Sequence, residues 1–411
     1  MKALSSHLIN INQEVEKEQG FEIDISQEQK DDSLKKALLN FIHQTIDAEN
    51  LVILAGSGTS LTFNTYKEDK SQSTIIAPGM ADLWNDCKKL NSSLFDEIMA
   101  IINYDSADNN IESLLSICDS HLILKAKSPD ELDKIKNFKE NAKLKILEST
   151  SFTDKVPTEK WVHRENFLRT LGYRGQKQQR LKLFTTNYDL AFETAASNTG
   201  MIVIDGFEYS KPARFNPAWF HYDVVNRSQS IENGSSYLSN VFHLYKLHGS
   251  VDWVRNTDTN LVQKGNPLSN EEGQEPVFIY PSSTKYQSSY NSPYLDMMSA
   301  FLNVLQKPKT ALICIGFGFN DDHLNNAITM ALRTNPEMML MVVTLNLFDE
   351  SSSFNANIRK SLINLIKGND SRIMLVDGTF SDFADILPNR TKETPEEKLA
   401  KMFESVMGGK E

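Results

Sequence analysis

The chain has 411 residues, 40% of them apolar, and a formal net charge of -11. That length is ample for a large buried core, and the acidic balance argues against direct binding to nucleic acid. The apolar runs fall short of the roughly 18 residues of a membrane span, and the first residues lack the apolar core of a signal peptide. We therefore expect a cytoplasmic protein with no membrane contact.

The cysteine count excludes one common kind of metal site. Cys87, Cys118 and Cys314 lie far apart, and the chain has no CxxC pair. A zinc site of four cysteines is impossible with three, and a disulfide framework is not expected. We predict no metal site.

The first third of the chain changes character twice. Residues 1–30 are polar and acidic and are predicted to form an N-terminal arm. From Asp32 or Ser33 onward, apolar residues recur at helical spacing, which predicts a helix. The apolar run 51–55 then ends in a Gly-rich segment, a pattern typical of a buried parallel strand followed by a tight turn.

Residues 81–169 are predicted to form an inserted helical subdomain. Apolar residues recur there every three or four positions, and no strand-like run interrupts them. Ser128-Pro129-Asp130-Glu131 has the composition of a helix start, with a capping Ser, a Pro in the first turn and a Glu three residues after the Ser.

From Leu181 onward, short apolar runs alternate with helical stretches. This alternation predicts an α/β fold with a Rossmann-like, mostly parallel sheet and helices on both faces. Residues 31–80 and 170–388 would form this domain, and residues 389–411 a C-terminal tail. Because ligands of such sheets bind at the carboxyl ends of the strands, the polar residues that end the runs are expected to converge on one crevice.

Several of these runs end in residues suited to ligand binding. They are followed by Gly56-Ser57-Gly58-Thr59-Ser60, Thr185-Thr186-Asn187-Tyr188-Asp189, His248-Gly249, Gly316-Phe317-Gly318 and Thr344-Leu345-Asn346. Glycines let a backbone approach a pyrophosphate, an Asn offers donors and an acceptor without charge, and a His can act as a base near neutral pH. Each motif alone is also compatible with a tight turn, a helix cap or, for His248, a structural role, and Asn320 is the predicted cap after the second Gly-rich turn.

Taken in order, the motifs resemble the sirtuin family, in which GAGxS, TQNxD and HG follow one another on a Rossmann sheet. The resemblance covers about 51–60 and 181–382, and its shared residues are Gly56, Gly58, Ser60, Asn187, Asp189, His248 and Gly249. Ser57 stands where the family has Ala, and Thr186 where it has Gln. The zinc-binding cysteine pairs of the deacylases are missing, as is their Arg-bearing segment after the first motif.

With these departures the chain looks like the bacterial sirtuin-like branch that hydrolyses NAD during antiphage defence, and FIYPSSTKY and GFGFNDDH are similar to that branch too. The resemblance implies an NAD glycohydrolase acting in abortive infection, with NAD as substrate and no zinc. Asn187 and His248 would be catalytic. The nucleotide would be held by Gly56, Ser57, Gly58, Thr59, Ser60, Thr186, Asp189, Gly249, Gly316, Gly318 and Asn346.

The resemblance also implies control of this activity, because an unregulated NAD hydrolase would poison its own cell. We expect a homo-oligomer and a separate activating protein, for which a HerA-type ATPase is the natural candidate. Two alternatives stay open at this point. One is a sirtuin-type protein deacylase or ADP-ribosyltransferase, and the other is a non-catalytic scaffold that binds NAD.

Overall fold

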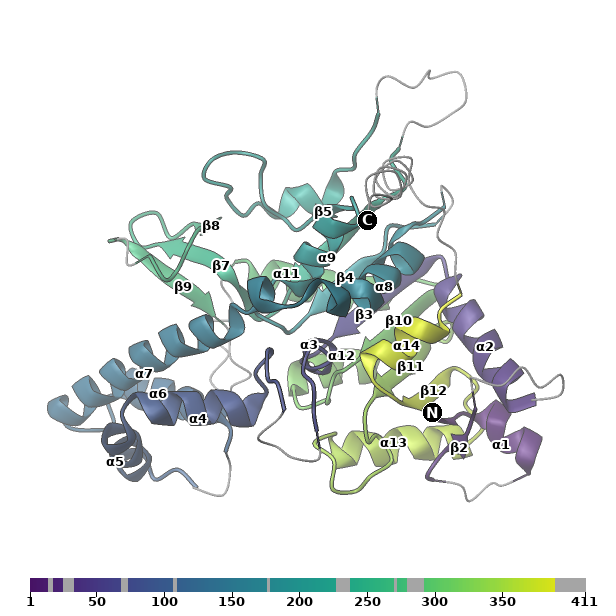
Figure 1. The fold of residues 1–411 in the computed structure, drawn as a ribbon, viewed down its shortest axis with the longest axis horizontal. Helices are drawn as coiled ribbons and strands as arrows, with labels where there is room; N and C mark the ends of the chain where they lie inside the picture. The colour runs from purple at the N-terminus through teal and green to yellow at the C-terminus, as the bar shows by residue number, and fades with distance from the viewer. Residues whose placement is uncertain are drawn as a thin grey trace, which may run out of the picture.

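A computed structural model describes residues 1–13, 18–24, 33–67, 73–105, 109–175, 178–226, 237–269, 272–278 and 292–388 (Figure 1). The FIYPSSTKY stretch beyond Phe278 and the predicted tail 389–411 lie outside these residues. Within the described part of the chain, no helix combines the length and the apolar character needed to cross a membrane.

A nine-stranded sheet forms the centre of the molecule. All neighbouring strands from β12 to β5 are parallel, so the predicted α/β class with a mostly parallel sheet is confirmed. In sheet order the strands are β2 (Phe21–Glu22), β1 (Lys2–Leu4), β12 (Ile373–Asp377), β11 (Met339–Thr344), β10 (Thr310–Ile315), β3 (Asn50–Ala55), β4 (Lys182–Thr185), β6 (Val241–Lys246) and β5 (Ile202–Ile204).

The strand order reverses between β3 and β10. From β3 the chain proceeds to β4, β5 and β6 on one side of the sheet, and then returns to β10, β11 and β12 on the other. In doubly wound sheets a reversal of this kind opens a crevice at the carboxyl ends of the two strands, which is where ligands bind.

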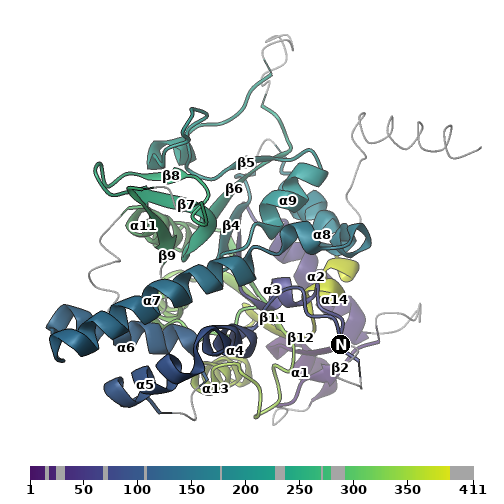
Figure 2. The same ribbon diagram turned by 60° about the vertical axis from the view of Figure 1, so that its left-hand side comes forward.

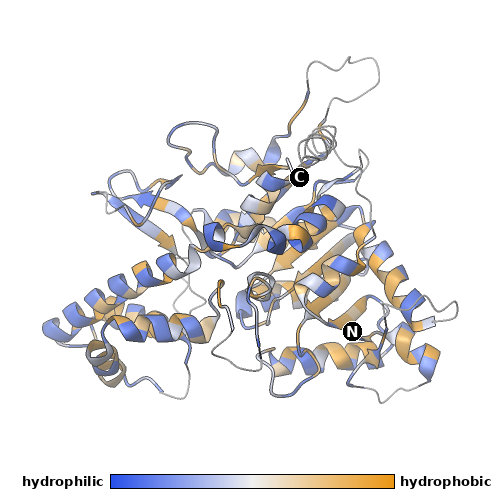
Figure 3. Ribbon diagram, in the orientation of Figure 1, coloured by the Kyte–Doolittle hydropathy of each residue, from blue (hydrophilic) through white to orange (hydrophobic). Residues whose placement is uncertain are grey.

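Both faces of the central strands are covered by helices. All residues of β3 and β10 are buried, as expected for continuous apolar runs in a parallel sheet (Figure 3). One packed group of helices comprises α8 (Val162–Gly172), α9 (Ala191–Asn198) and α14 (Phe380–Ile386). Another comprises α11 (Tyr294–Leu305) and α12 (Asp322–Thr334), with α11 packed on β10.

Four helices inserted after β3 pack beside the sheet (Figures 1 and 2) around an apolar cluster of their own. They are α4 (Met80–Leu90), α5 (Ser92–Ile102), α6 (Ile111–Leu124) and α7 (Pro129–Thr150). Ser128 and Glu131 form the predicted capping box of α7. The predicted extent of 81–169 is too long, because α8 belongs to the main core, where the Phe167 ring lies 5.0 Å from that of Phe380.

The N-terminal residues are not the predicted arm. β1 pairs antiparallel with β12 and β2, and α1 (Ser6–Asn12) contacts α2 (Ser33–Ile46) and α13 (Ala356–Lys367). Ala3, Leu4 and Leu8 are fully buried. The few apolar side chains in this polar segment anchor it in the core. The backbone of β1 then pairs with the edge of β12, which would otherwise expose unpaired backbone groups.

A second, antiparallel sheet departs from the end of β6. Its strands are β7 (Gly249–Asn256), with β8 (Val262–Lys264) on one side and β9 (Gln274–Phe278) on the other. The short apolar run of β9 therefore lies outside the parallel sheet that the alternating runs after Leu181 predict. After β7 the chain turns back twice, so that β8 and β9 each pair antiparallel with β7.

Candidate active site at the strand reversal

The turn after β4 and the turn after β3 form one buried polar cluster. Asn187 Nδ2 donates to Thr59 Oγ1 at 3.2 Å and to Ser60 Oγ at 3.1 Å, and the Asn187 side chain is only 8% exposed. Ser60 Oγ in turn donates to Asp189 Oδ2 at 2.7 Å. Asp189 Oδ1 accepts from the Ala191 amide at the start of α9. Asp189 therefore orients Ser60 and also accepts a hydrogen bond from the first residue of α9.

These contacts determine which way the Asn187 amide points. The Thr59 hydroxyl donates its proton to Gly56 O at 2.8 Å, and the Ser60 hydroxyl donates its own to Asp189. Both hydroxyls can then only accept from Asn187, so the NH₂ group faces them. The amide oxygen, Oδ1, has no hydrogen-bond partner among the described residues and stays available as an acceptor.

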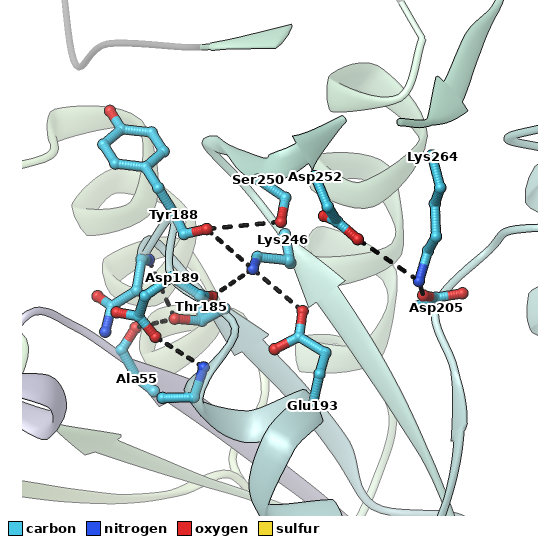
Figure 4. Close-up of polar contacts among 12 residues, drawn as sticks. Ala55, Thr185, Tyr188, Asp189, Glu193, Asp205, Lys246, Ser250, Asp252 and Lys264 are labelled. Carbon is cyan, nitrogen blue, oxygen red and sulfur yellow. Dashed lines mark hydrogen bonds and ion pairs between the residues drawn. The ribbon is translucent and has the colours of Figure 1, made fainter. Parts of the chain in front are cut away.

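A buried lysine, Lys246, donates hydrogen bonds to the backbone of the residues that follow Asn187 (Figure 4). Lys246 Nζ, at the end of β6, donates to the backbone carbonyls of Tyr188 and Asp189 and lies 3.0 Å from Glu193 Oε1. Burial raises the pKa of Glu193, and the nearby Lys246 opposes that shift. Lys246 was not predicted from the sequence, although a lysine at the end of a mostly apolar strand is a signal for such a role.

His248 follows β6 and is 4% exposed. Its Nε2 lies 3.1 Å from Oδ2 of Asp321, which precedes α12. The other carboxylate oxygen of Asp321 accepts from the amides of His323 and Leu324, so Asp321 and not Asn320 caps this helix. Asn320 instead donates to the carbonyl of Ser353. An Asp directly before a helix is a recognised cap residue, so the sequence held this signal.

The Asn187 and His248 turns adjoin each other. β4 and β6 are parallel neighbours, and Leu247 N donates to Thr185 O at 2.8 Å. The ring of Tyr188 lies 6.4 Å from that of His248, and Val251 N donates to Tyr188 O. The expected convergence of the strand ends therefore brings the two predicted catalytic residues to neighbouring positions.

The two Gly-rich turns pack directly against each other. Gly58 N donates to Gly316 O at 2.9 Å, and Gly316 has φ +59°. A Cβ on Gly56 would lie 2.5 Å from Gly316 O, and one on Gly58 would lie 2.7 Å from Gly316 Cα. These glycines are thus required where the strand ends meet at the reversal.

Residues 181–366 match the SIR2-like domain. The solved structures that resemble the chain include a mutant Sir2 homologue with 2′-O-acetyl ADP-ribose (14% identity, TM-score 0.37, 87% of this chain and 95% of that one). A Sir2 variant with a deacetylated p53 peptide and 3′-O-acetyl ADP-ribose has 10% identity and a TM-score of 0.37, and the match covers 85% of this chain and 96% of that one. A Sir2 homologue mutant with ADP-ribose has 12% sequence identity and a TM-score of 0.33, and the match covers 80% of this chain and 96% of that one. No curated protein matches this sequence.

The SIR2-like region contains Asn187, His248 and Asp321, whereas the Gly56–Ser60 turn precedes it and joins it through the hydrogen bonds described above. Most amides of that turn are already bonded. Those of Gly58, Thr59 and Ser60 donate to Gly316, Gly56 and Ser57. The following helix, α3 (Gly58–Leu61), is a single turn. Phosphate binding by this turn therefore stays a prediction, and the exposed Ser57 is its most accessible residue.

The remaining predicted nucleotide residues lie at or after the ends of neighbouring strands. Thr186 N donates to Ala55 O, Gly249 has φ +90° where β7 begins, and Gly318 follows the second turn. Asn346, after β11, is exposed, and its backbone amide donates to Asp377 Oδ1 at 2.7 Å. Among the described residues no hydrogen bond joins Asn346 to the Asn187–His248 cluster.

A buried arginine that sequence reasoning missed supports Thr59. Arg164, on α8, is 1% exposed, and its Nη2 donates to Thr59 O at 2.6 Å. Its guanidinium carbon lies 4.3 to 5.2 Å from the ring centroids of Phe63, Phe192 and Phe380, and burial lowers its pKa to about 10. Arg164 Nε and Nη1 have no hydrogen-bond partner among the described residues. Aromatic faces surround the cation in place of acceptors.

In the described part of the chain, no group of three or more His, Cys, Asp or Glu side chains is placed to hold a metal ion. All three cysteines are buried, and burial raises the pKa of the Cys87 and Cys118 thiols to about 12. Burial also raises the pKa of Cys314. Nucleophilic cysteines have lowered thiol pKa values, so none of the three cysteines has the environment of a nucleophile.

Proposed function

We propose that this chain is an NAD glycohydrolase that cleaves NAD to ADP-ribose and nicotinamide. The observation that carries the proposal is the placement of Asn187 Oδ1 and the His248 ring on adjoining turns beside the strand reversal. Because this pair lies in a region that matches the SIR2-like domain, NAD is the substrate class it favours. The missing cysteine pairs argue against the peptide-binding zinc module of deacylases.

The reaction makes modest demands on the protein. Nicotinamide leaves the ribose as a neutral molecule from a cationic pyridinium, so no acid is required to protonate it. The electrons of the C1′–N bond return to the nicotinamide nitrogen, water adds its oxygen to C1′, and one proton is released. The barrier lies in forming the oxocarbenium-like ribose, which an enzyme lowers by binding that state more tightly than the substrate.

We assign the two central residues complementary roles. Asn187 Oδ1 accepts a hydrogen bond from the attacking water or from a ribose hydroxyl, while its NH₂ group stays fixed on Thr59 and Ser60. His248 takes the proton as water adds. Asp189 and Lys246 hold the turn in place, and we assign Ser57, Gly318 and Asn346 to binding the rest of the nucleotide.

The test measures the products from purified protein and NAD, with and without an acetylated peptide. Free ADP-ribose and nicotinamide without peptide support the proposal, and acetyl-ADP-ribose formed only with peptide would indicate a deacylase. Asn187→Ala and His248→Ala are each expected to lower kcat on the order of 10²–10⁴-fold with little change in melting temperature. Near-wild-type turnover by both variants would refute the assigned roles, and binding of NAD without turnover would favour the scaffold alternative.

We further propose that the hydrolase is a homo-oligomer acting in antiphage defence and that a HerA-type ATPase controls it. The support is the similarity of the sequence motifs to that branch of sirtuin-like proteins. Coexpression with a HerA-type ATPase is expected to give a complex that depletes NAD during phage infection. Separate elution of the two proteins, or unchanged NAD, would contradict this regulation.

A further inference from the structure

We propose that Asp321 is a positioning residue that selects the tautomer of His248 needed for proton transfer. The inference rests on the proposed hydrolysis of NAD, in which His248 is the base. It concerns a carboxylate 73 positions away in the chain, on the far side of the strand reversal.

The Asp321 carboxylate is held in one orientation. Its Oδ1 accepts from the amides of His323 at 2.9 Å and Leu324 at 3.4 Å, at the first turn of α12. Its Oδ2 faces His248 Nε2 at 3.1 Å, and both side chains are 5% exposed. Because α12 requires an acceptor at this position, the carboxylate cannot turn away from the imidazole without uncapping the helix.

This orientation determines which ring nitrogen of neutral His248 carries the proton. An ionised carboxylate only accepts, so Nε2 must be the donor and Nδ1 carries the lone pair. No hydrogen bond to Nδ1 is found within the described residues. Nδ1 is therefore the atom available to take a proton from water.

Asp321 would also stabilise the imidazolium formed when His248 takes the proton. Among the described residues, the titratable groups near the pair include Tyr188, whose ring lies beside His248, and Tyr294 on α11, which interacts with Asp321. The buried Lys246–Glu193 pair contacts the Asn187 turn through the hydrogen bonds of Lys246 to the carbonyls of Tyr188 and Asp189. Asp321 is the one carboxylate recorded in hydrogen-bonding distance of the His248 ring among the described residues.

Asp321→Asn is the variant that separates tautomer selection from folding. Asn is as good a helix cap as Asp, but its oxygen is needed by the amides of α12. Its NH₂ group then faces His248 Nε2, which must become the acceptor, and the proton moves to Nδ1. The base is lost although the shape of the site is kept, as in other His–Asp pairs.

The experiment reads the tautomer and the turnover of the same proteins. In ¹⁵N-histidine-labelled full-length chain, with the His248 signal assigned from His248→Gln, we expect an Nε2–H tautomer in the wild type and Nδ1–H in Asp321→Asn. With NAD, kcat of Asp321→Asn is expected to fall on the order of 10²–10⁴-fold with KM changed much less. Asp322→Asn removes the same charge from an exposed neighbour in the same turn and serves as the control.

The possible outcomes are distinct. The same tautomer in wild type and Asp321→Asn, or a kcat within twofold of Asp322→Asn, would overturn the proposal. A third outcome is that Asp321→Asn inverts the tautomer but the wild type releases no nicotinamide. That result would support the Asp321–His248 geometry and count against NAD hydrolysis. Melting temperatures of all three proteins check that the cap of α12 is intact.

Discussion

At the scale of single residues, contact between backbones decides which glycines matter. Gly316 and Gly200 both have positive φ angles of similar size, +59° and +63°. A Cβ on Gly316 would lie 2.5 Å from Thr59 N, whereas one on Gly200 would meet nothing within 4 Å. The two positions therefore carry the same conformational cost for a side chain but differ in the space around it.

We expect Gly316→Ala to destabilise the protein by several kcal/mol, because strain and a backbone clash add. Gly200→Ala, the matched control, is expected to cost only about 1–2 kcal/mol from the left-handed backbone. Equilibrium unfolding in urea measures both values. Equal losses of unfolding free energy in the two variants would show that the two Gly-rich turns are less closely packed than described. Space for a ligand would then be the better explanation for a glycine at position 316.

At the scale of elements, the helical cluster contacts the Asn187 turn directly. Tyr188 Oη donates to Glu112 Oε1, on α6, at 3.0 Å. The Tyr188 ring also belongs to a small apolar cluster with Leu147 of α7 and Val251 of β7. A displacement of α6 or α7 would therefore act on the residue next to Asn187, which makes this helical cluster a suitable place for control of activity.

Tyr188→Phe removes the hydrogen bond to α6 and keeps the ring. It is expected to lower the free energy of unfolding by about 0.5–1.5 kcal/mol and to lower kcat for nicotinamide release. The control is Tyr104→Phe, which removes a hydrogen bond to Asn110 O within the helical cluster, away from the site. Similar stability losses with a kcat change only in Tyr188→Phe support the coupling, and identical kcat values in the two variants would exclude it.

At the scale of the whole molecule, a buried histidine makes the fold sensitive to acid. His243, in β6, is 7% exposed and its Nδ1 lies 3.4 Å from the Tyr245 hydroxyl. Burial, with a further contribution from the positive charge of Lys182, lowers the pKa of His243 from 6.5 to about 3. Between those two values the unfolded chain binds a proton that the folded chain does not, so stability rises with pH and is lost as the pH falls below 6.5.

His243→Gln should therefore flatten the dependence of unfolding free energy on pH. The wild type is expected to lose up to about 1.4 kcal/mol per pH unit more than the variant between pH 6 and pH 4. Urea unfolding across that range measures the difference. His43→Gln, an exposed histidine of α2, is the control, and parallel curves for wild type and His243→Gln would show that His243 is protonated in the folded protein.

Local sequence patterns were sufficient for most strands of the parallel sheet and for the inserted helices, but not for β1, β2 and α1 in the expected arm. Continuous apolar runs predicted the buried strands β3, β4, β10 and β11, helical spacing predicted α2 and α4 to α7, and turn residues after strands marked Asn187 and His248. Such patterns succeed because periodicity, capping and glycine turns act over a few neighbouring residues.

Contacts between distant segments were decided only by the tertiary structure. Ser60 meets Asp189 across 129 positions and His248 meets Asp321 across 73, because the strand order brings the ends of β3, β4, β6 and β10 together. The hydrogen bond from Arg164 to the carbonyl of Thr59 and the pairing of β1 with β12 also join segments that are far apart in the chain. By itself the sequence determined the parallel α/β class and the polar residues at its strand ends. The pairing of those residues depended on strand order, which no local pattern encodes.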